Sequence, residues 1–176
     1  NAEKLNPKNV LGISVIGVLG YYVASYLDLY GLQFVSAALE RIILYTYPAF
    51  VLIFSVLFLR QPSSRMLWLC VGVIYIGLML VVKADIDVNP AVPLQTTLYG
   101  SLFVFLSAIS FAFYVIGSSH YMQVFSSLFF TSLAMMAAGM CMVLHYAVRA
   151  DFADLLELSA PIYLWSLLNA VVFTVL

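Results

Sequence analysis

Long apolar segments follow one another along almost the whole chain, each close to the length that a bilayer requires. A helix needs about 20 apolar residues to cross a hydrocarbon core of roughly 30 Å. Backbone polar groups without partners are costly in lipid, so we expect each segment to be helical. The segments are continuously apolar and longer than the roughly ten-residue alternating strands of membrane barrels. They cover residues 10–30, 35–59, 66–82, 97–119, 124–148 and 161–176.

Charged residues are scarce for a chain of this length. They make up 9% of its 176 residues, against about 25% in ordinary globular domains, and the mean hydropathy is +1.08. The expected fold is therefore all-α, a polytopic membrane helix bundle with the lipid bilayer as its main partner. A net charge of −1 provides no basic surface, so nucleic acid is not an expected partner.

Motifs for catalysis and for cofactor or metal binding are absent from the sequence. Cys70 and Cys141 lie midway along apolar segments, and neither His120 nor His145 has metal-ligand spacing to them. We interpret both cysteines as small buried hydrophobes. No Gly-rich phosphate loop, HExxH pair or nucleophile motif occurs. We therefore expect no enzyme activity, no cofactor and no metal.

One of the connectors between the apolar segments divides the chain. Residues 83–96 contain two aspartates and the prolines Pro90 and Pro93, which predicts an ordered or extended link rather than a helix. In residues 149–160, apolar side chains at helical spacing predict a short interfacial helix. Pro161 then suits the first turn of the last segment.

The ends of the sequence and its basic residues bear on topology. The last segment has no charge, turn or cap, and the chain begins at Asn1 close to another apolar segment, so we expect an internal piece of a longer protein. Lysines and arginines in short loops favour the cytoplasm, and the tight turn with Arg60 and Arg65 places the start of the first segment there. The expected location is the cell (inner) membrane, with a multi-pass topology.

Small and hydroxylated residues form stripes at helical spacing on three of the expected helices. Lipid gives no drive to bury apolar groups, so such stripes favour helix packing or a cavity. Plain packing and a solvated substrate path both stay open. The stripes are Ser14, Gly17, Tyr21, Ala24 and Asp28 in the first segment, Gly100, Ser107, Ser110, Tyr114, Gly117 and Ser118 in the fourth, and Ser127, Thr131, Ala134, Ala138, Cys141 and His145 in the fifth. On the opposite face of the fourth segment, large apolar residues are expected to face lipid, namely Leu102, Phe105, Leu106, Ile109, Phe113 and Ile116.

Three charged residues lie at or near membrane depth, namely Asp28, Glu40 and Arg41. Ionisable groups there are costly and often functional, so all three are candidates for gating or ion coupling. The alternative is that their charged heads reach water or pair locally. An Asp28–Arg41 pair across the first hairpin fits the spacing, whereas adjacent Glu40 and Arg41 are not expected to face each other on a helix.

Aromatic and polar residues of the apolar segments are candidates for lining a substrate cavity. Pro48 removes a backbone donor and is expected to bend its helix near mid-membrane. An asparagine side chain near mid-membrane needs a hydrogen-bond partner, either from another helix or from a substrate. The candidates are Tyr21, Tyr45, Tyr47, Pro48, Ser110, Tyr114, Trp165 and Asn169.

An ordered set of features resembles the EamA-type branch of the drug/metabolite transporter (DMT) superfamily. In that family a helix end similar to residues 32–38 leads into a helix with a central proline, here Pro48. A short polar turn follows at residues 60–65, then a helix with Gly72 and Gly77, and residues 110–114 resemble a later family segment. The chain departs from the family at Arg60-Gln61, where Gly-Glu is frequent.

The resemblance implies a carrier of ten helices in two inverted halves, of which this chain would hold helices three to eight. Residues 1–83 would then be the end of the first EamA-like repeat, with three helices. Residues 84–96 would be the linker between repeats. Residues 97–176 would begin the second repeat, with two helices and a truncated third. Inverted repeats commonly place a substrate site at their interface near the midplane.

The sequence therefore predicts part of a transporter for small organic metabolites or drugs that works by alternating access. A small-molecule substrate is an expected partner, and a homodimer is left open. Two alternatives also stay open. One is a complete six-helix channel or structural membrane subunit. The other is a proton-coupled antiporter like the small multidrug transporters, for which Glu40 is the nearest candidate carboxyl group.

Overall fold

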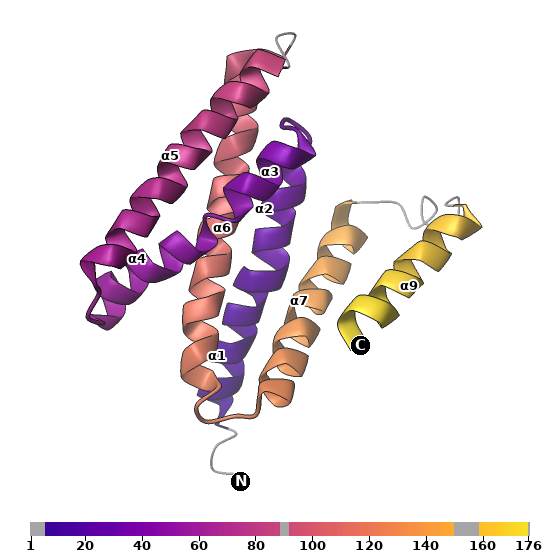
Figure 1. Cartoon of the computed structure of the whole chain (residues 1–176). Coiled ribbons are helices and arrows are strands. Elements are labelled where there is room, and N and C mark those ends of the chain that lie inside the picture. The colour runs from indigo at the N-terminus through magenta and orange to yellow at the C-terminus, as the bar shows by residue number, and fades with distance from the viewer. Residues whose placement is uncertain (1–5, 89–91, 150–158, 176) are drawn as a thin grey trace. The chain divides into compact units, whose positions relative to one another are not determined.

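The computed structural model describes residues 6–88, 92–149 and 159–175, and all regular structure in these ranges is helical (Figure 1). The expected all-α fold is therefore confirmed. The predicted interfacial helix falls mostly outside the described residues. The elements are α1 (Pro7–Gly17), the π-helix η2 (Val18–Val23), α2 (Ala24–Gly31), α3 (Ala37–Leu44), α4 (Tyr47–Leu59), α5 (Arg65–Val88), α6 (Leu94–Tyr121), α7 (Ser127–Arg149) and α9 (Ala160–Val175).

Five helical stretches in the described ranges are long and apolar enough to cross a membrane. They match the first five expected segments, with ends that differ by a few residues. The sixth, α9, has 16 residues and at 1.5 Å per residue is about 24 Å long. Pro161 lies in its first turn, as predicted. The five stretches are Pro7–Gly31, Ala37–Leu59, Arg65–Asp87, Leu94–Tyr121 and Ser127–Arg149.

The prediction of a non-helical link at residues 83–96 is wrong in part, because helices occupy most of these residues. α5 continues to Val88 and α6 begins at Leu94. Pro90 comes after the last residue of α5 and Pro93 is the N-cap of α6, so neither proline removes a hydrogen bond from a helix interior. The Ser36 hydroxyl donates to Asp85 Oδ1 at 2.5 Å. This bond holds the C-terminal end of α5 to the start of α3.

The second span is broken rather than bent. α3 ends at Leu44 and α4 begins at Tyr47, so the predicted single kinked helix is replaced by two helices and a short turn. Pro48 lies in the first turn of α4, where its missing N–H would have no partner in the helix. The Thr46 hydroxyl donates to the Ile43 carbonyl at 2.6 Å and so satisfies a backbone acceptor at the break.

The chain divides into two compact units, Asn1–Cys141 and Met142–Leu176, with the boundary inside α7. In the first unit, α6 runs beside the continuous first span made of α1, η2 and α2 (Figure 1). The helices α3 and α4 also pack on α6. α6 is therefore the central helix of the first unit.

Small residues let these helices approach closely. A Cβ atom on Gly100 of α6 would lie 2.9 Å from the Gly31 carbonyl oxygen of α2. One on Gly17 of α1 would lie 2.5 Å from Cα of Ala134 in α7. Both pairs belong to the predicted stripes or adjoin them, and lipid-embedded helices commonly use small residues in this way. Parts of the small-residue faces of the first unit are thus packing surfaces, as one of the two interpretations expected.

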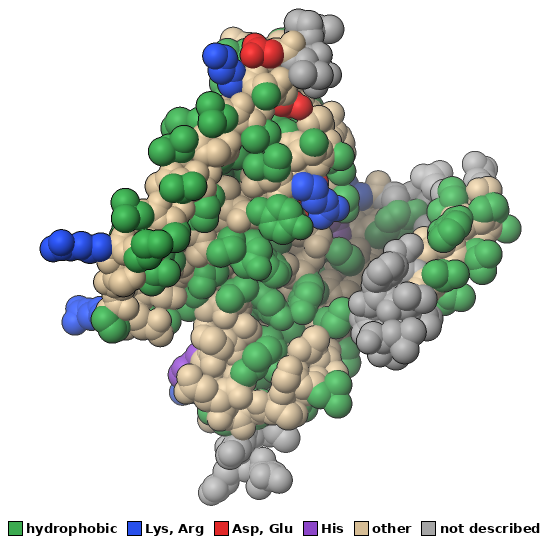
Figure 2. Space-filling model, in the orientation of Figure 1, with side chains coloured by type: hydrophobic (Ala, Val, Ile, Leu, Met, Phe, Trp, Pro, Cys, Tyr) green, Lys and Arg blue, Asp and Glu red, His purple; other side chains and the backbone are tan. Residues whose placement is uncertain are grey.

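The outward faces of the same helices are apolar. Figure 2 shows hydrophobic side chains spread along α4 and α5, with few charged ones among them. Leu102, Leu106 and Phe113 of α6 are exposed, as predicted for the face opposite the small residues. Phe105 and Ile109 were expected on that outer face too, but they pack against the buried clusters around Val104 and Ala108. The broad outer surface suits contact with acyl chains.

Candidate functional site

A cavity of about 260 Å³ lies where the first span, the broken second span and α6 meet. Its volume is slightly below the range of about 300–1,000 Å³ that is usual for ligand pockets, so it suits a small solute. The first span contributes five of its residues, α3, α4 and the turn between them contribute four, and α6 contributes two. The lining consists of Gly20, Tyr21, Ala24, Ser25, Asp28, Arg41, Leu44, Tyr45, Tyr47, Ser107 and Phe111.

The wall that the first span contributes to the cavity includes the π-helix. Its wider turn occupies Val18–Val23, and such short π-segments are frequent at functional sites. Two serines of α6 donate hydrogen bonds to carbonyls within the π-helix and at the residue that follows it. Ser110 Oγ donates to the Leu19 carbonyl at 2.8 Å, and Ser107 Oγ donates to the Ala24 carbonyl at 2.7 Å. These bonds tie the irregular backbone to the central helix.

Aromatic rings surround one side of the cavity. The hydroxyl groups of Tyr21 and Tyr114 lie 2.8 Å apart, and the two rings meet edge to face with centroids 5.0 Å apart. Tyr47 and Phe111 also meet edge to face, with centroids 5.1 Å apart. Such pairs add stability beyond the area that they bury. These contacts therefore orient the rings along this side of the cavity.

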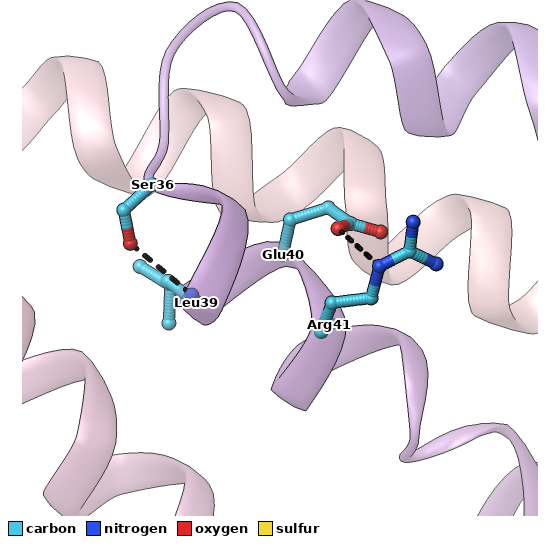
Figure 3. Close-up of polar contacts among 4 residues, drawn as sticks. All are labelled: Ser36, Leu39, Glu40 and Arg41. Carbon is cyan, nitrogen blue, oxygen red and sulfur yellow. Dashed lines mark hydrogen bonds and ion pairs between the residues drawn. The ribbon is translucent and has the colours of Figure 1, made fainter.

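The charged residues lie at the same corner but differ from expectation. Glu40 is only 1% exposed, and its Oε2 lies 3.3 Å from Nε of Arg41, which is 67% exposed (Figure 3). The prediction that Glu40 and Arg41 do not face each other is wrong, because the long arginine side chain turns back toward its neighbour. Glu40 does not reach water, but its ion pair with Arg41 is the local pairing that the alternative interpretation allowed.

Asp28 completes this corner of the cavity. The carboxyl groups of Asp28 and Glu40 are close enough to hydrogen-bond to each other if one of them carries a proton. Asp28 Oδ1 and Glu40 Oε1 are both buried and receive no hydrogen bond from the parts of the chain that the structure describes. The Asp28–Arg41 pair expected across the hairpin is replaced by the Glu40–Arg41 pair. Both Asp28 and Arg41 nevertheless line the cavity.

The cavity brings together five of the predicted residues, and four others lie next to its lining. Ser110 bonds to η2, Tyr114 touches Tyr21, and Glu40 pairs with Arg41. Pro48 follows Tyr47 at the start of α4. The predicted residues in the lining are Tyr21, Asp28, Arg41, Tyr45 and Tyr47.

Six lining residues were not among the predicted site residues, namely Gly20, Ala24, Ser25, Leu44, Ser107 and Phe111. Ser25 follows Tyr21 by one helical turn, Ser107 belongs to the predicted stripe of α6, and Phe111 lies between Ser110 and Tyr114 in the segment that carries the family resemblance. Helical spacing from the predicted residues would have found Ser25 and Ser107. Only the packing of α6 against α4 brings Phe111 to the cavity.

The remaining candidates lie in the second unit or away from the cavity. Trp165 is on α9 and its side chain is exposed, while the side chain of Asn169 lies outside the described residues. Cys70 and Cys141 are free thiols, with Cys70 exposed rather than buried as expected. Among the described residues, no group of three or more histidine, cysteine or acidic side chains could hold a metal ion.

Comparison with known proteins bears on the family of the chain. Residues 1–83 match the EamA-like transporter family. The chain belongs to the EamA-like transporter family. It is also 30% identical over 137 residues to the uncharacterized transporter YcbK of Bacillus subtilis (strain 168). That match covers 76% of this chain and 42% of YcbK, so the chain spans less than half the length of this relative. No solved structure matches.

Proposed function

We propose that the protein containing this EamA-like chain carries a small organic solute across the cell (inner) membrane by alternating access, and that the cavity is part of the solute path. The observation that supports this is which parts of the chain form the cavity wall. Gly20 to Asp28 and Arg41 to Tyr47 lie within the family match at residues 1–83, whereas Ser107 and Phe111 lie beyond it.

The position of the cavity fits a carrier with inverted repeats. In such carriers the substrate site lies near the midplane, between the repeats, and the repeats rock against each other. If residues 84–96 link the two repeats, the first two spans belong to one half and α6 to the other. Rocking would then open and close the cavity. The start of the first span would be cytoplasmic, and helices three to eight of a ten-helix carrier would be present here.

A cavity-filling substitution tests the proposal. Ser25→Trp should place an indole ring in the cavity and abolish solute uptake, because the lining would leave no room for the solute. Leu29→Trp is the matched control, since Leu29 is on the same helix and 61% exposed. Uptake of radiolabelled amines, amino acids, organic acids and sugars would be measured with the full-length protein in liposomes. Uptake by Ser25→Trp at the unchanged rate, with correct folding, would refute the proposal.

The buried carboxyl group of Glu40 favours one second candidate, a proton-coupled antiporter. An ionisable group at membrane depth whose oxygen lacks a partner is a frequent feature of proton relays. Glu40→Gln should then abolish solute flux that is driven by a proton gradient while solute exchange persists. Unchanged proton-driven flux in Glu40→Gln would remove this candidate and leave the uncoupled carrier.

A further inference from the structure

When both carboxyl groups are ionised, the charged corner of the cavity has one negative charge more than it has positive charges. Glu40 pairs with Arg41, and these two charges cancel. The carboxyl group of Asp28 is left over. Its Oδ1 atom is buried and has no hydrogen-bond donor among the described residues, yet the residue lines the cavity. Buried carboxylates are costly unless a positive charge or a donor compensates them.

The rest of the lining offers the second feature that a positively charged ligand needs. Tyr21, Tyr45 and Tyr47 all line the cavity. The negative face of an aromatic ring attracts a cation within about 6 Å of the ring centroid, most strongly where water is excluded. Tyr21 and Tyr47 are oriented by their edge-to-face contacts with Tyr114 and Phe111. A carboxylate beside aromatic rings therefore forms a site of small volume with negative potential.

We propose that this cavity binds an organic cation, a small solute whose protonated amine lies against the Asp28 carboxylate and whose apolar part contacts the tyrosine rings. The inference rests on the proposed transport function and names the chemical class of its solute. The ammonium group supplies the donor that Asp28 Oδ1 lacks. It also relieves the repulsion between the carboxyl groups of Asp28 and Glu40, which face each other.

An anionic solute does not fit the same charges. Arg41 is the cation that lines the cavity, and its Nε already pairs with Glu40. The Nη groups of this guanidinium can still donate, but a carboxylate ligand bound to them would lie close to the carboxyl groups of Glu40 and Asp28. Like charges brought together at low dielectric are strongly disfavoured, so the cavity selects against such a ligand.

Binding of two probes of nearly equal shape tests the charge requirement. Phenethylamine carries an ammonium group at neutral pH, and phenethyl alcohol replaces it with a neutral hydroxyl group. We would measure both affinities by calorimetry on the purified full-length protein in lipid nanodiscs, with 3-phenylpropionate as the anionic probe. We expect the amine to bind at least tenfold more tightly than the alcohol, and the anion to bind most weakly.

Asp28→Asn should remove the preference for the amine, because the amide keeps the shape of the side chain without its charge. Asp87→Asn is the matched control, since Asp87 is exposed near the end of α5, and it should keep the preference. Thermal unfolding of each variant verifies folding. Equal affinities for amine and alcohol, stronger binding of the anion, no binding of any probe, or a preference that survives in Asp28→Asn would overturn the proposal. If Ser25→Trp still abolishes uptake of some other solute, only the charge inference fails and the carrier stands.

Discussion

The helices α5 and α6 are both long, of nearly equal hydropathy, and yet differ in what surrounds them. In the most apolar 18-residue stretch of each, 39% of the α6 residues are buried but only 6% of the α5 residues. α6 has seven serines and threonines between residues 94 and 121, whereas α5 has none between 65 and 88. In a membrane protein, small and hydroxylated side chains therefore indicate burial better than hydropathy does.

Glycine-to-alanine substitutions should have opposite effects in the two helices, and this is the largest expected difference. A Cβ at Gly100 of α6 would lie 2.6 Å from the Phe34 Cβ and 2.9 Å from the Gly31 carbonyl oxygen. At Gly77 of α5 it would meet nothing within 4 Å. Gly100→Ala should lower stability by about 1–3 kcal/mol through overpacking. Gly77→Ala should raise it by about 0.5–1 kcal/mol, since glycine is a poor helix former.

Unfolding of both glycine variants in detergent, followed by intrinsic fluorescence, measures this difference. If Gly100→Ala were as stable as the parent protein, the close approach of α6 and α2 would be wrong.

Valine truncation provides a second contrast of smaller size. Val104 of α6 is fully buried, whereas Val73 of α5 is 68% exposed. Val104→Ala should cost about 1–2 kcal/mol, because it removes two methyl groups and leaves a void beside Leu39 and Ile43. Val73→Ala should change stability by less than about 0.5 kcal/mol. The two melting temperatures measured in the same lipid would test this, and equal losses would contradict the burial difference.

The serines of α6 should have a moderate effect on stability. Ser107→Ala and Ser110→Ala each remove a hydrogen bond to the first span, and such bonds between membrane helices contribute about 0.6 kcal/mol on average and up to roughly 1.7. Ser119→Ala is the matched control, because Ser119 is exposed and donates within its own helix. Hydrogen exchange at residues 18–24 should increase in the first two variants. Unchanged exchange there would mean that these bonds do not hold the π-helix.

The contrast between α5 and α6 also shows which features of the fold can be predicted from the sequence. Apolar length predicts the five spans, and the spacing of Gly100, Ser107 and Tyr114 predicts the buried face of α6. The π-helix is not predictable in this way, because Val18–Val23 has the same apolar composition as an ordinary helix. The contacts that accompany it are the hydrogen bonds from Ser107 and Ser110 of α6 to Ala24 and Leu19, which are far apart in sequence from those serines.

The candidate site was predictable in its aromatic part but not in its charges. The positions of Tyr21 and Tyr47 on their expected helices were enough to assign them to a cavity. The burial of Glu40 depends on how α3 lies against α2 and α6, and no local pattern indicates it. The pairing of Arg41 with Glu40 likewise depends on the flexibility of a long side chain, which residue spacing alone does not describe.

The turn between α4 and α5 provides the smallest expected effect and tests the departure from the family pattern at Arg60. Among the described residues, Arg60 is the non-glycine residue with positive φ, at φ 51° and ψ 32°. This left-handed conformation costs an L-residue roughly 1–2 kcal/mol and costs glycine almost nothing. Arg60→Gly should therefore relieve local strain, while the greater freedom of glycine in the unfolded chain offsets part of the gain. We expect a net stabilisation of about 0.5 kcal/mol, measurable as a small rise in the unfolding midpoint. Arg65→Gly, which places glycine at the first residue of α5, should lower the midpoint instead, and a lower midpoint for Arg60→Gly as well would show that the arginine side chain contributes more than the backbone strain costs.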